Sequence, residues 1–209
     1  MSRHPIFARL YATASRYEER LGVTDHRREL LEGLAGRVVE VGAGNGLNFA
    51  RYPTGVTEVV AVEPEPYLRR LAARAAERAP VPVRLLDGVA DALPLESASF
   101  DAAVVSLVLC SVPDQATALA ELTRVLRPGG ELRFYEHVAA DGARLRGLQR
   151  SLDHLWPRVA GGCHTARDTV AAIEAAGFHV DRCRRFTFRP NVLATPTSPQ
   201  VIGSARAPR

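Results

Sequence analysis

Three closely spaced glycines are the first residues of this sequence whose type and spacing suggest chemistry. They stand at positions 42, 44 and 46 of the segment RVVEVGAGNGLNFARYP, directly after an apolar run that ends in Glu40. Glycines at this density let the backbone turn tightly and approach a ligand closely, and we expect them to open a helix whose N–H groups face that ligand. The pattern indicates a nucleotide-type cofactor site rather than an ordinary strand-to-helix turn.

A second acid follows at the end of the next apolar run, where Glu58 to Val62 is followed by Glu63 and Pro64. An acid at the tip of the second strand can accept hydrogen bonds from both ribose hydroxyls of a bound nucleoside. The dinucleotide fingerprint G-x-G-x-x-G would place its third glycine one position beyond Gly46. A nucleotide-dependent oxidoreductase is therefore the least favoured reading of this loop.

Candidates for acceptor chemistry follow two later apolar runs. Glu136 and His137 end the run that begins at Glu131, and they are the best-placed residues to remove a proton or to steady an anion. Cys110 follows the run Ala102 to Leu107, where either a role in the reaction or packing in the pocket wall would suit it. Four further polar or aromatic residues lie in the irregular segment after His137 and are expected to form substrate walls: Asp153, His154, Trp156 and His164.

The composition fits one soluble α/β domain. The chain has 209 residues, 46% of them hydrophobic, and no apolar run approaches the ~18 residues of a membrane span. We find no signal peptide and expect a cytoplasmic protein. All 27 basic residues are arginines, which suggests a GC-rich bacterial genome and excludes lysine-based catalysis. The net charge is only +4, and acids alternate with arginines, so no nucleic-acid partner is expected.

The cysteines of the sequence predict neither disulfides nor a metal site. Cys110, Cys163 and Cys183 are far apart in the sequence and form no C-x-x-C pair, so neither a disulfide framework nor a zinc site is indicated. His164 follows Cys163 directly, but neighbouring side chains on an extended segment diverge, so a metal shared by these two is not expected. The sequence predicts no metal site.

The elements that must position these residues alternate between strand and helix, which predicts a parallel, doubly wound sheet. Two N-terminal helices between Phe7 and Leu34, broken near Gly22, form an expected lid of residues 1–36 on a core of residues 37–209, with a substrate-wall insert near 138–164. Strands are expected at 38–41, 58–62, 83–86, 102–107, 131–137, 178–188 and 200–205. Helices are expected at 67–79, 114–126 and 165–176.

The motif Glu40-x-Gly42-x-Gly44-x-Gly46, with Glu63 after the second strand, resembles motif I of the class I S-adenosylmethionine (SAM) methyltransferases. That resemblance implies the Rossmann-like seven-stranded fold, mostly parallel, with a C-terminal antiparallel hairpin and helices on both faces. It also implies SAM as cofactor and S-adenosylhomocysteine (SAH) as product. The residues expected to bind SAM are Tyr11, Glu40, Gly42, Ala43, Gly44, Gly46, Asn48, Glu63, Pro64, Val89, Ala90, Ser106 and Leu107, with Asp91 as a second candidate for the adenine contact.

Three further segments narrow the resemblance. SLVLCSV from Ser106, VLRPGGELRFYEHVAA from Val125, and Trp156 with GGC at 161–163 are similar to the mammalian alkyl thiol methyltransferases and their bacterial relatives. The chain departs from them at Asn45, where threonine is common, and at Gln200, where the tail often has histidine. The membrane-anchoring N-terminal helix of the mammalian proteins is also missing, which implies a soluble enzyme without a membrane span.

The expected function is methyl transfer from SAM to a small-molecule acceptor, with thiol S-methylation first. Such a transfer needs mainly an acceptor held in line and without water, and a base is optional for a thiol. The alternatives are N-methylation of a phospholipid or amine, O-methylation of a natural product, or SAM binding without turnover. Oligomeric state cannot be inferred from the sequence.

Overall fold

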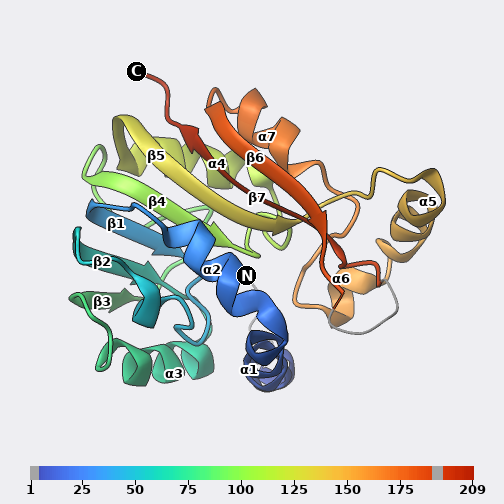
Figure 1. Ribbon diagram of the computed structural model, residues 1–209, viewed down its shortest axis with the longest axis horizontal. Coiled ribbons are helices and arrows are strands. Elements are labelled where there is room, and N and C mark those ends of the chain that lie inside the picture. Colours follow the sequence, from blue (N-terminus) through green and yellow to red (C-terminus); the bar gives the residue numbers. More distant parts are fainter. Residues whose placement is uncertain (1–4, 190–194) are drawn as a thin grey trace.

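The computed structural model describes residues 5–189 and 195–209, in which strands and helices alternate as the sequence predicts (Figure 1). The strands are β1 (Gly36–Val41), β2 (Val56–Val62), β3 (Val83–Leu86), β4 (Phe100–Ser106), β5 (Leu126–His137), β6 (His179–Thr187) and β7 (Pro199–Arg206). The helices are α1 (Pro5–Glu18), α2 (Thr24–Leu31), α3 (Pro66–Ala76), α4 (Gln115–Val125), α5 (Ala143–Leu152), α6 (Trp156–Val159) and α7 (Thr169–Ala175), with a π-helical turn at Glu19–Val23 and a 3₁₀ turn at Phe49–Arg51.

The strands form one seven-stranded sheet in the order β3-β2-β1-β4-β5-β7-β6. The first five strands pair in parallel, and β7 lies antiparallel between β5 and β6. The predicted mixed sheet with a C-terminal hairpin is therefore confirmed. The order reverses between β1 and β4, and ligands of open α/β sheets bind beyond the carboxyl ends of the strands at such a point.

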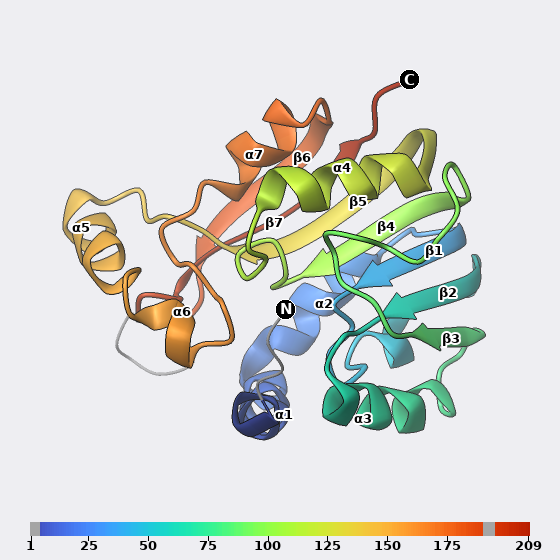
Figure 2. The same cartoon turned by 180° about the vertical axis from the view of Figure 1, so that it is seen from behind.

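Helices cover both faces of the sheet, which explains why its central strands are apolar throughout. On one face, Leu30 and Leu31 of α2 pack with Phe49 and Ala72 against β1 and β2. On the other face lie α4 and α7, which stand in front of the sheet in Figure 2. Their buried side chains are Ala118, Leu119, Leu122 and Val125 from α4 and Ile173 from α7.

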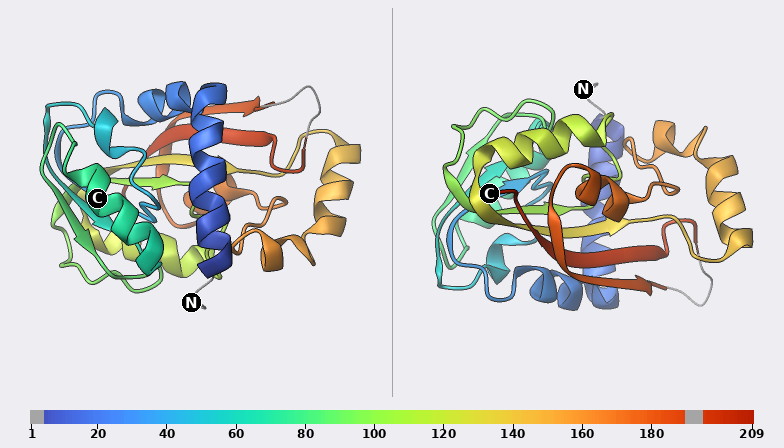
Figure 3. Two further views of the ribbon diagram at one scale, coloured as in Figure 1. Left: turned by 90° about the horizontal axis from the view of Figure 1, so that it is seen from below. Right: turned by 90° about the horizontal axis from the view of Figure 1, so that it is seen from above.

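The N-terminal helices break where the sequence predicts. Gly22 has a φ of 111°, a conformation that a residue with a side chain rarely adopts, and the chain changes direction there between α1 and α2. Helix α2 then packs on the sheet, whereas α1 crosses the ends of the strands (Figure 3). Helix α1 thereby lies over the side of the sheet at which a ligand is expected.

Three expectations about helices are wrong. After the glycine loop there is only the short 3₁₀ turn, because Pro53 and the start of β2 at Val56 leave too few residues for a helix. The predicted helix 165–176 begins only at Thr169, where the side chain of Asp168 accepts a hydrogen bond from the Ala171 amide. The insert after β5 is not wholly irregular, since it contains α5 and α6.

Candidate active site

One cavity of about 550 Å³ lies at the carboxyl ends of β1, β2, β4 and β5. This volume is within the roughly 300–1,000 Å³ typical of small-molecule sites. Eight of the residues predicted to bind the cofactor line it: Tyr11, Gly42, Gly44, Glu63, Pro64, Ala90, Ser106 and Leu107. Helix α1 contributes one side of the wall.

The glycines of the loop do not all serve the cavity. Gly44 faces it, and a Cβ on Gly44 would lie 3.3 Å from the ring of Tyr11. Gly46 instead packs inward, where a Cβ would lie 2.8 Å from Ala75 and 2.9 Å from the Phe49 ring. All three glycines have positive φ angles, 71°, 57° and 78° in chain order, so the loop needs glycine for its backbone as well as for space. Ala43 and Gly46 do not line the cavity.

Glu63 joins the second strand to the glycine loop. Its Oε2 accepts a hydrogen bond of 2.8 Å from the Gly44 amide, and its Oε1 accepts one of 2.9 Å from the Glu65 amide. Burial raises the pKa of this carboxyl, and the two amide bonds act in the opposite direction. Each carboxylate oxygen can accept a further bond. Glu63 can therefore hold the loop and a ribose at the same time.

Glu40 and Asn48 lie beneath the loop rather than in the cavity wall. Glu40 accepts hydrogen bonds from Asn48 Nδ2 at 2.8 Å and from the Tyr52 hydroxyl at 2.7 Å. Burial raises the pKa of Glu40 to about 7, against the effect of these two bonds. Glu40 and Asn48 therefore support the glycine loop from beneath and do not contact the cavity.

Arg27 is a buried support that sequence reasoning missed. The residue is 5% exposed, and its side chain donates to Glu19 at 2.6 Å and to Asn48 Oδ1 at 2.9 Å. A longer contact of 3.4 Å reaches the hydroxyl of Ser106 at the end of β4. Arg27 thus connects the N-terminal helices to the glycine loop and to β4. As one of many arginines on a helix, it gave no signal in the sequence.

The end of β4 and the segment after β3 complete this end of the cavity. Leu107 has a φ of 61°, which is strained for a residue with a side chain, and such strain concentrates at functional sites. Gly88 and Ala90 line the cavity, whereas Val89 does not. Asp91, beside them, has a buried Oδ1 with no hydrogen-bond partner within residues 5–189 and 195–209.

These residues fit SAM. Gly44 exposes its backbone to the cavity, and Glu63 retains acceptor capacity for a ribose. Asp91, the second candidate for the adenine contact, does not line the cavity. The expected set of cofactor residues therefore divides into a wall that includes Gly44 and Glu63 and a support that includes Glu40 and Asn48.

At the other end of the cavity, Glu136 is turned away from the opening. It is fully buried, and its carboxylate accepts hydrogen bonds from the amides of Val108, Leu109 and Cys110 at 2.9–3.0 Å. Burial raises its pKa while these amides lower it. Glu136 does not line the cavity. Through these three hydrogen bonds Glu136 fixes the backbone of the loop after β4, including Cys110.

His137 and Cys110 both line the cavity, and the structure adds Cys163 to them. His137 Nδ1 lies 3.4 Å from Cys163 Sγ and 3.8 Å from Cys110 Sγ, and the two sulfurs are 3.8 Å apart. The hydrogen bond with Cys163, followed by burial, holds the pKa of the Cys110 thiol well above its ordinary value. Although 53 residues separate these cysteines, the fold brings them into contact, so their separation in the sequence was a poor guide.

The insert supplies the rest of the wall. Trp156 lines the cavity, and its buried Nε1 donor has no partner in the described part of the chain. Asp153 and His164 instead bond each other at 2.8 Å, and His154 is likewise outside the wall. Gln200 also lines the cavity and accepts a 2.6 Å hydrogen bond from the Tyr135 hydroxyl.

A sheet of this order, with a glycine loop after β1, an acid after β2 and a cavity at the switch point, defines a class I methyltransferase architecture. Comparison with known proteins agrees. Residues 39–134 match the model of a methyltransferase domain family. A SAM-dependent methyltransferase of Thermotoga maritima has the same fold, with a TM-score of 0.68 and 24% identity over 97% of this chain and 98% of that one.

Two curated methyltransferases are similar to this chain over most of its length. The chain is 36% identical to the thiol S-methyltransferase TMT1B of Mus musculus over 84% of this chain and 73% of that protein. It is 34% identical to the ubiquinone/menaquinone biosynthesis C-methyltransferase UbiE of Syntrophotalea carbinolica over 78% of this chain and 72% of that protein. The chain belongs to the class I SAM-dependent methyltransferases, so SAM is its methyl donor and SAH its product.

Within the described residues, no helix combines the length and the apolar character that crossing a bilayer requires.

Proposed function

We propose that this methyltransferase transfers the methyl group of SAM to a small thiol. The observation that carries the proposal is the acceptor end of the cavity, where two cysteine sulfurs and an imidazole stand beside apolar walls while the carboxylate of Glu136 is occupied by backbone amides. The name of the mouse relative supports the same reaction.

A thiol makes the smallest demand on such a site. For a thiol of pKa ~8.5, roughly a tenth is already thiolate near pH 7.5, whereas a phenol near pKa ~10 or a protonated amine needs a proton acceptor. The enzyme must then mainly hold the sulfur about 3 Å from the methyl carbon, in line and away from water. The apolar side chains of Phe7, Val112 and Val159 in the cavity wall suit that task.

Different residues serve the cofactor end and the acceptor end of the cavity. SAM, when bound, supplies an electrophilic methyl group. Gly44, Glu63 and Tyr11 bind and orient it at one end of the cavity. His137 faces the acceptor end, where it can steady an anionic sulfur, and Glu136 positions Cys110 through its bonds to the loop after β4.

The test compares a phospholipid with three acceptors that share one carbon skeleton. Purified protein is incubated with methyl-labelled SAM and with phenylmethanethiol, benzylamine, 4-methylphenol or phosphatidylethanolamine liposomes, and labelled products are identified by mass spectrometry. We expect the thiol to have the highest kcat/KM. The Cys183→Ser variant is the control, because Cys183 is an exposed residue of β6 that lies outside the cavity wall.

Four other results would each replace the thiol reading. Preferential methylation of benzylamine or of the liposomes would indicate an N-methyltransferase, and methylation of the phenol oxygen an O-methyltransferase. Carbon methylation of an activated ring would indicate the reaction named for the UbiE relative. SAM binding without any turnover would leave a binding protein.

A further inference from the structure

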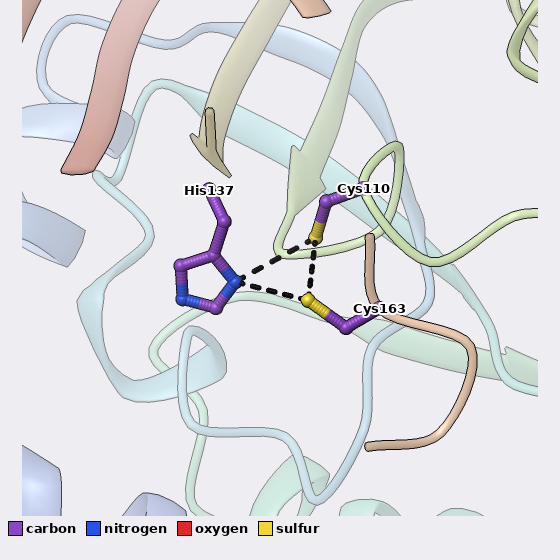
Figure 4. Close-up of side chains that lie close together, drawn as sticks. All are labelled: Cys110, His137 and Cys163. Atoms are coloured by element: carbon purple, nitrogen blue, oxygen red, sulfur yellow. Dashed lines mark hydrogen bonds between the residues drawn. The ribbon is translucent and has the colours of Figure 1, made fainter. Parts of the chain in front are cut away.

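Three metal-ligating atoms meet at the acceptor end of the cavity (Figure 4). Sγ of Cys110, Sγ of Cys163 and Nδ1 of His137 all lie within 4.8 Å of one another, and Figure 4 shows the imidazole edge turned toward both sulfurs. The residues come from three separate segments: the loop after β4, the end of β5 and the loop after α6. Such a convergence of two thiols and one imidazole is the ligand set of a Cys₂His zinc site.

The spacing of the three atoms fits a tetrahedral ion. Zinc bonds sulfur at about 2.3 Å and imidazole nitrogen at about 2.0–2.1 Å, so a tetrahedron places two sulfurs about 3.8 Å apart and sulfur and nitrogen about 3.6 Å apart. The observed separations are 3.8 Å between the sulfurs and 3.4 and 3.8 Å from each sulfur to Nδ1. The three atoms therefore stand at ligand distances without any movement of the backbone.

The backbone around the two cysteines is fixed by specific bonds. Glu136 holds the amide of Cys110, and the carbonyl of Cys110 accepts a 2.7 Å bond from the amide of His164, next to Cys163. A Cβ on Gly162 would lie 2.6 Å from the carbonyl oxygen of Ser111, so the two loops approach each other as closely as glycine permits. These contacts hold the sulfurs together independently of any contact between the sulfurs themselves.

A second set of bonds fixes the Cys163 loop from outside. Asp153 accepts a 2.8 Å bond from the amide of Thr165 and pairs with His164 at 2.8 Å. Arg167 donates to the carbonyls of Leu109 and Val112 at 2.9 and 2.6 Å. Hydrogen-bonded loops of this kind preorganise metal ligands.

We propose that Cys110, His137 and Cys163 bind one Zn²⁺ ion and leave its fourth coordination position open to the cavity. Catalytic zinc sites keep such an open position, and all three side chains line the cavity wall. The two thiolates balance the charge of the ion, so the buried site is neutral until a fourth ligand binds. The ion binds whether or not the substrate is a thiol.

The substrate's sulfur is the fourth ligand, and this second step rests on the proposed thiol function. On binding, the thiol gives its proton to solvent and stays on the ion as a thiolate. The sulfur then forms a bond to the methyl carbon of SAM, and the carbon–sulfonium bond breaks with its electron pair passing to the sulfur of SAH. The products are a thioether, SAH and one proton, and the neutral thioether is a weak ligand that leaves the ion.

The first experiment measures metal binding without activity. The full chain is purified anaerobically with a thiol-free reductant, stripped with a chelator and titrated with Co²⁺, whose thiolate charge-transfer and tetrahedral visible bands report the ligand set. We expect one equivalent to bind, with Zn²⁺ displacing it. Cys163→Ser and His137→Asn should weaken binding roughly tenfold or more, since even the hydrogen-bond partners of metal ligands are worth about 10–100-fold.

Cys183→Ser is the matched control, because Cys183 is an exposed free cysteine on β6, and its Co²⁺ spectrum should equal that of the parent. SAH binding by calorimetry verifies that each variant is folded. A titration without stoichiometric binding, a spectrum unchanged by Cys163→Ser, or a Cys110–Cys163 disulfide in the anaerobic protein would overturn the metal site.

The second experiment separates the metal from the reaction. Phenylmethanethiol should change the Co²⁺ spectrum and benzylamine should not, which supports the open position. If the chelated enzyme methylates thiols at the full rate, the metal step fails while the thiol function stands. If Co²⁺ binds through the three residues but no thiol is methylated, the function fails while the metal site stands.

Discussion

At the scale of single residues, one motif contains glycines with different tasks. Gly42 and Gly46 are required by packing, because a Cβ would lie 2.5 Å from Val108 in the first case and 2.8 Å from Ala75 in the second. A Cβ on Gly44 would meet only the ring of Tyr11, at 3.3 Å, and Gly44 lines the cavity. The three positions have the same residue type, so only the fold shows which glycine is free of close packing and lines the cavity.

Gly44→Val should therefore abolish SAM binding in calorimetry while the protein stays folded. A branched side chain would fill the space beside Tyr11 and prevent the backbone from approaching the ligand. Gly129→Val is the matched control, because Gly129 has a similar φ of 72° and no atom within 4 Å of its Cβ position. Both variants incur the same kind of backbone strain, so only a loss confined to Gly44→Val supports the assignment. Equal affinities would remove Gly44 from the site.

Sequence reasoning at this scale succeeded for residues whose position in an element determines their environment. Gly44, Glu63 and Ser106 follow strands, and parallel strands end at one edge of the sheet, so their convergence could be expected. Cys163 could not be assigned in this way. It reaches Cys110 only because two loops, separated by a strand and three helices, are held together by bonds such as that from the His164 amide.

At the scale of elements, the end of β5 shows how a strand assigns different tasks to neighbouring residues. Side chains alternate along a strand, so Glu136 and His137 point to different sides. His137 faces the cavity, and Glu136 faces the amides of the loop after β4. The sequence offers both as candidates for proton transfer, and the structure places His137 in the cavity wall and Glu136 against the loop after β4.

Glu136→Gln should lower kcat/KM for the acceptor by the same factor at every pH from 6 to 9. The amide side chain offers one acceptor oxygen instead of two, so at least one of the three loop amides loses its bond, at a cost of about 1–3 kcal/mol in unfolding free energy. Thermal unfolding and the pH profile together test this. A loss concentrated at low pH would instead indicate that Glu136 takes a proton. SAH affinity, measured in parallel, should change little.

Strands were easier to predict than helices in this chain. All seven expected strands are present, including β6, most of whose residues are exposed, because apolar runs ended by turn residues mark most of the strands. The expected helix after the glycine loop is absent, since the distance to β2 rather than helix propensity decides that segment. Helix α5 was missed although leucines recur at helical spacing in its sequence, ARLRGLQRSL, at positions 145, 148 and 152. Of this helix only Gln149 is buried.

At the scale of the whole molecule, α1 joins the N-terminal segment to the site. It crosses the ends of the strands (Figure 3), and Tyr11, Ser15 and Glu18 from it line the cavity. Behind it, Arg27 connects α2 with the glycine loop through Asn48 and with the turn before α2 through Glu19. The cofactor and the N-terminal helices are therefore expected to stabilise each other, because each completes the other's contacts.

Hydrogen exchange measures this coupling directly. If α1 must open before SAH can leave, bound SAH should slow exchange of the α1 amides, by up to ~100-fold when free SAH is 100 times its Kd. Helix α7 is the internal control, because it packs on the outer face of the sheet and contributes nothing to the cavity wall. Slowing in α1 without slowing in α7 would indicate that the helix acts as a lid on the cofactor. Unchanged exchange in α1, with SAH binding shown by calorimetry on the same sample, would mean that the cofactor enters and leaves without moving it. Its residues would then be a fixed wall, and access to the site would have to lie beside the insert that carries Trp156 and Cys163.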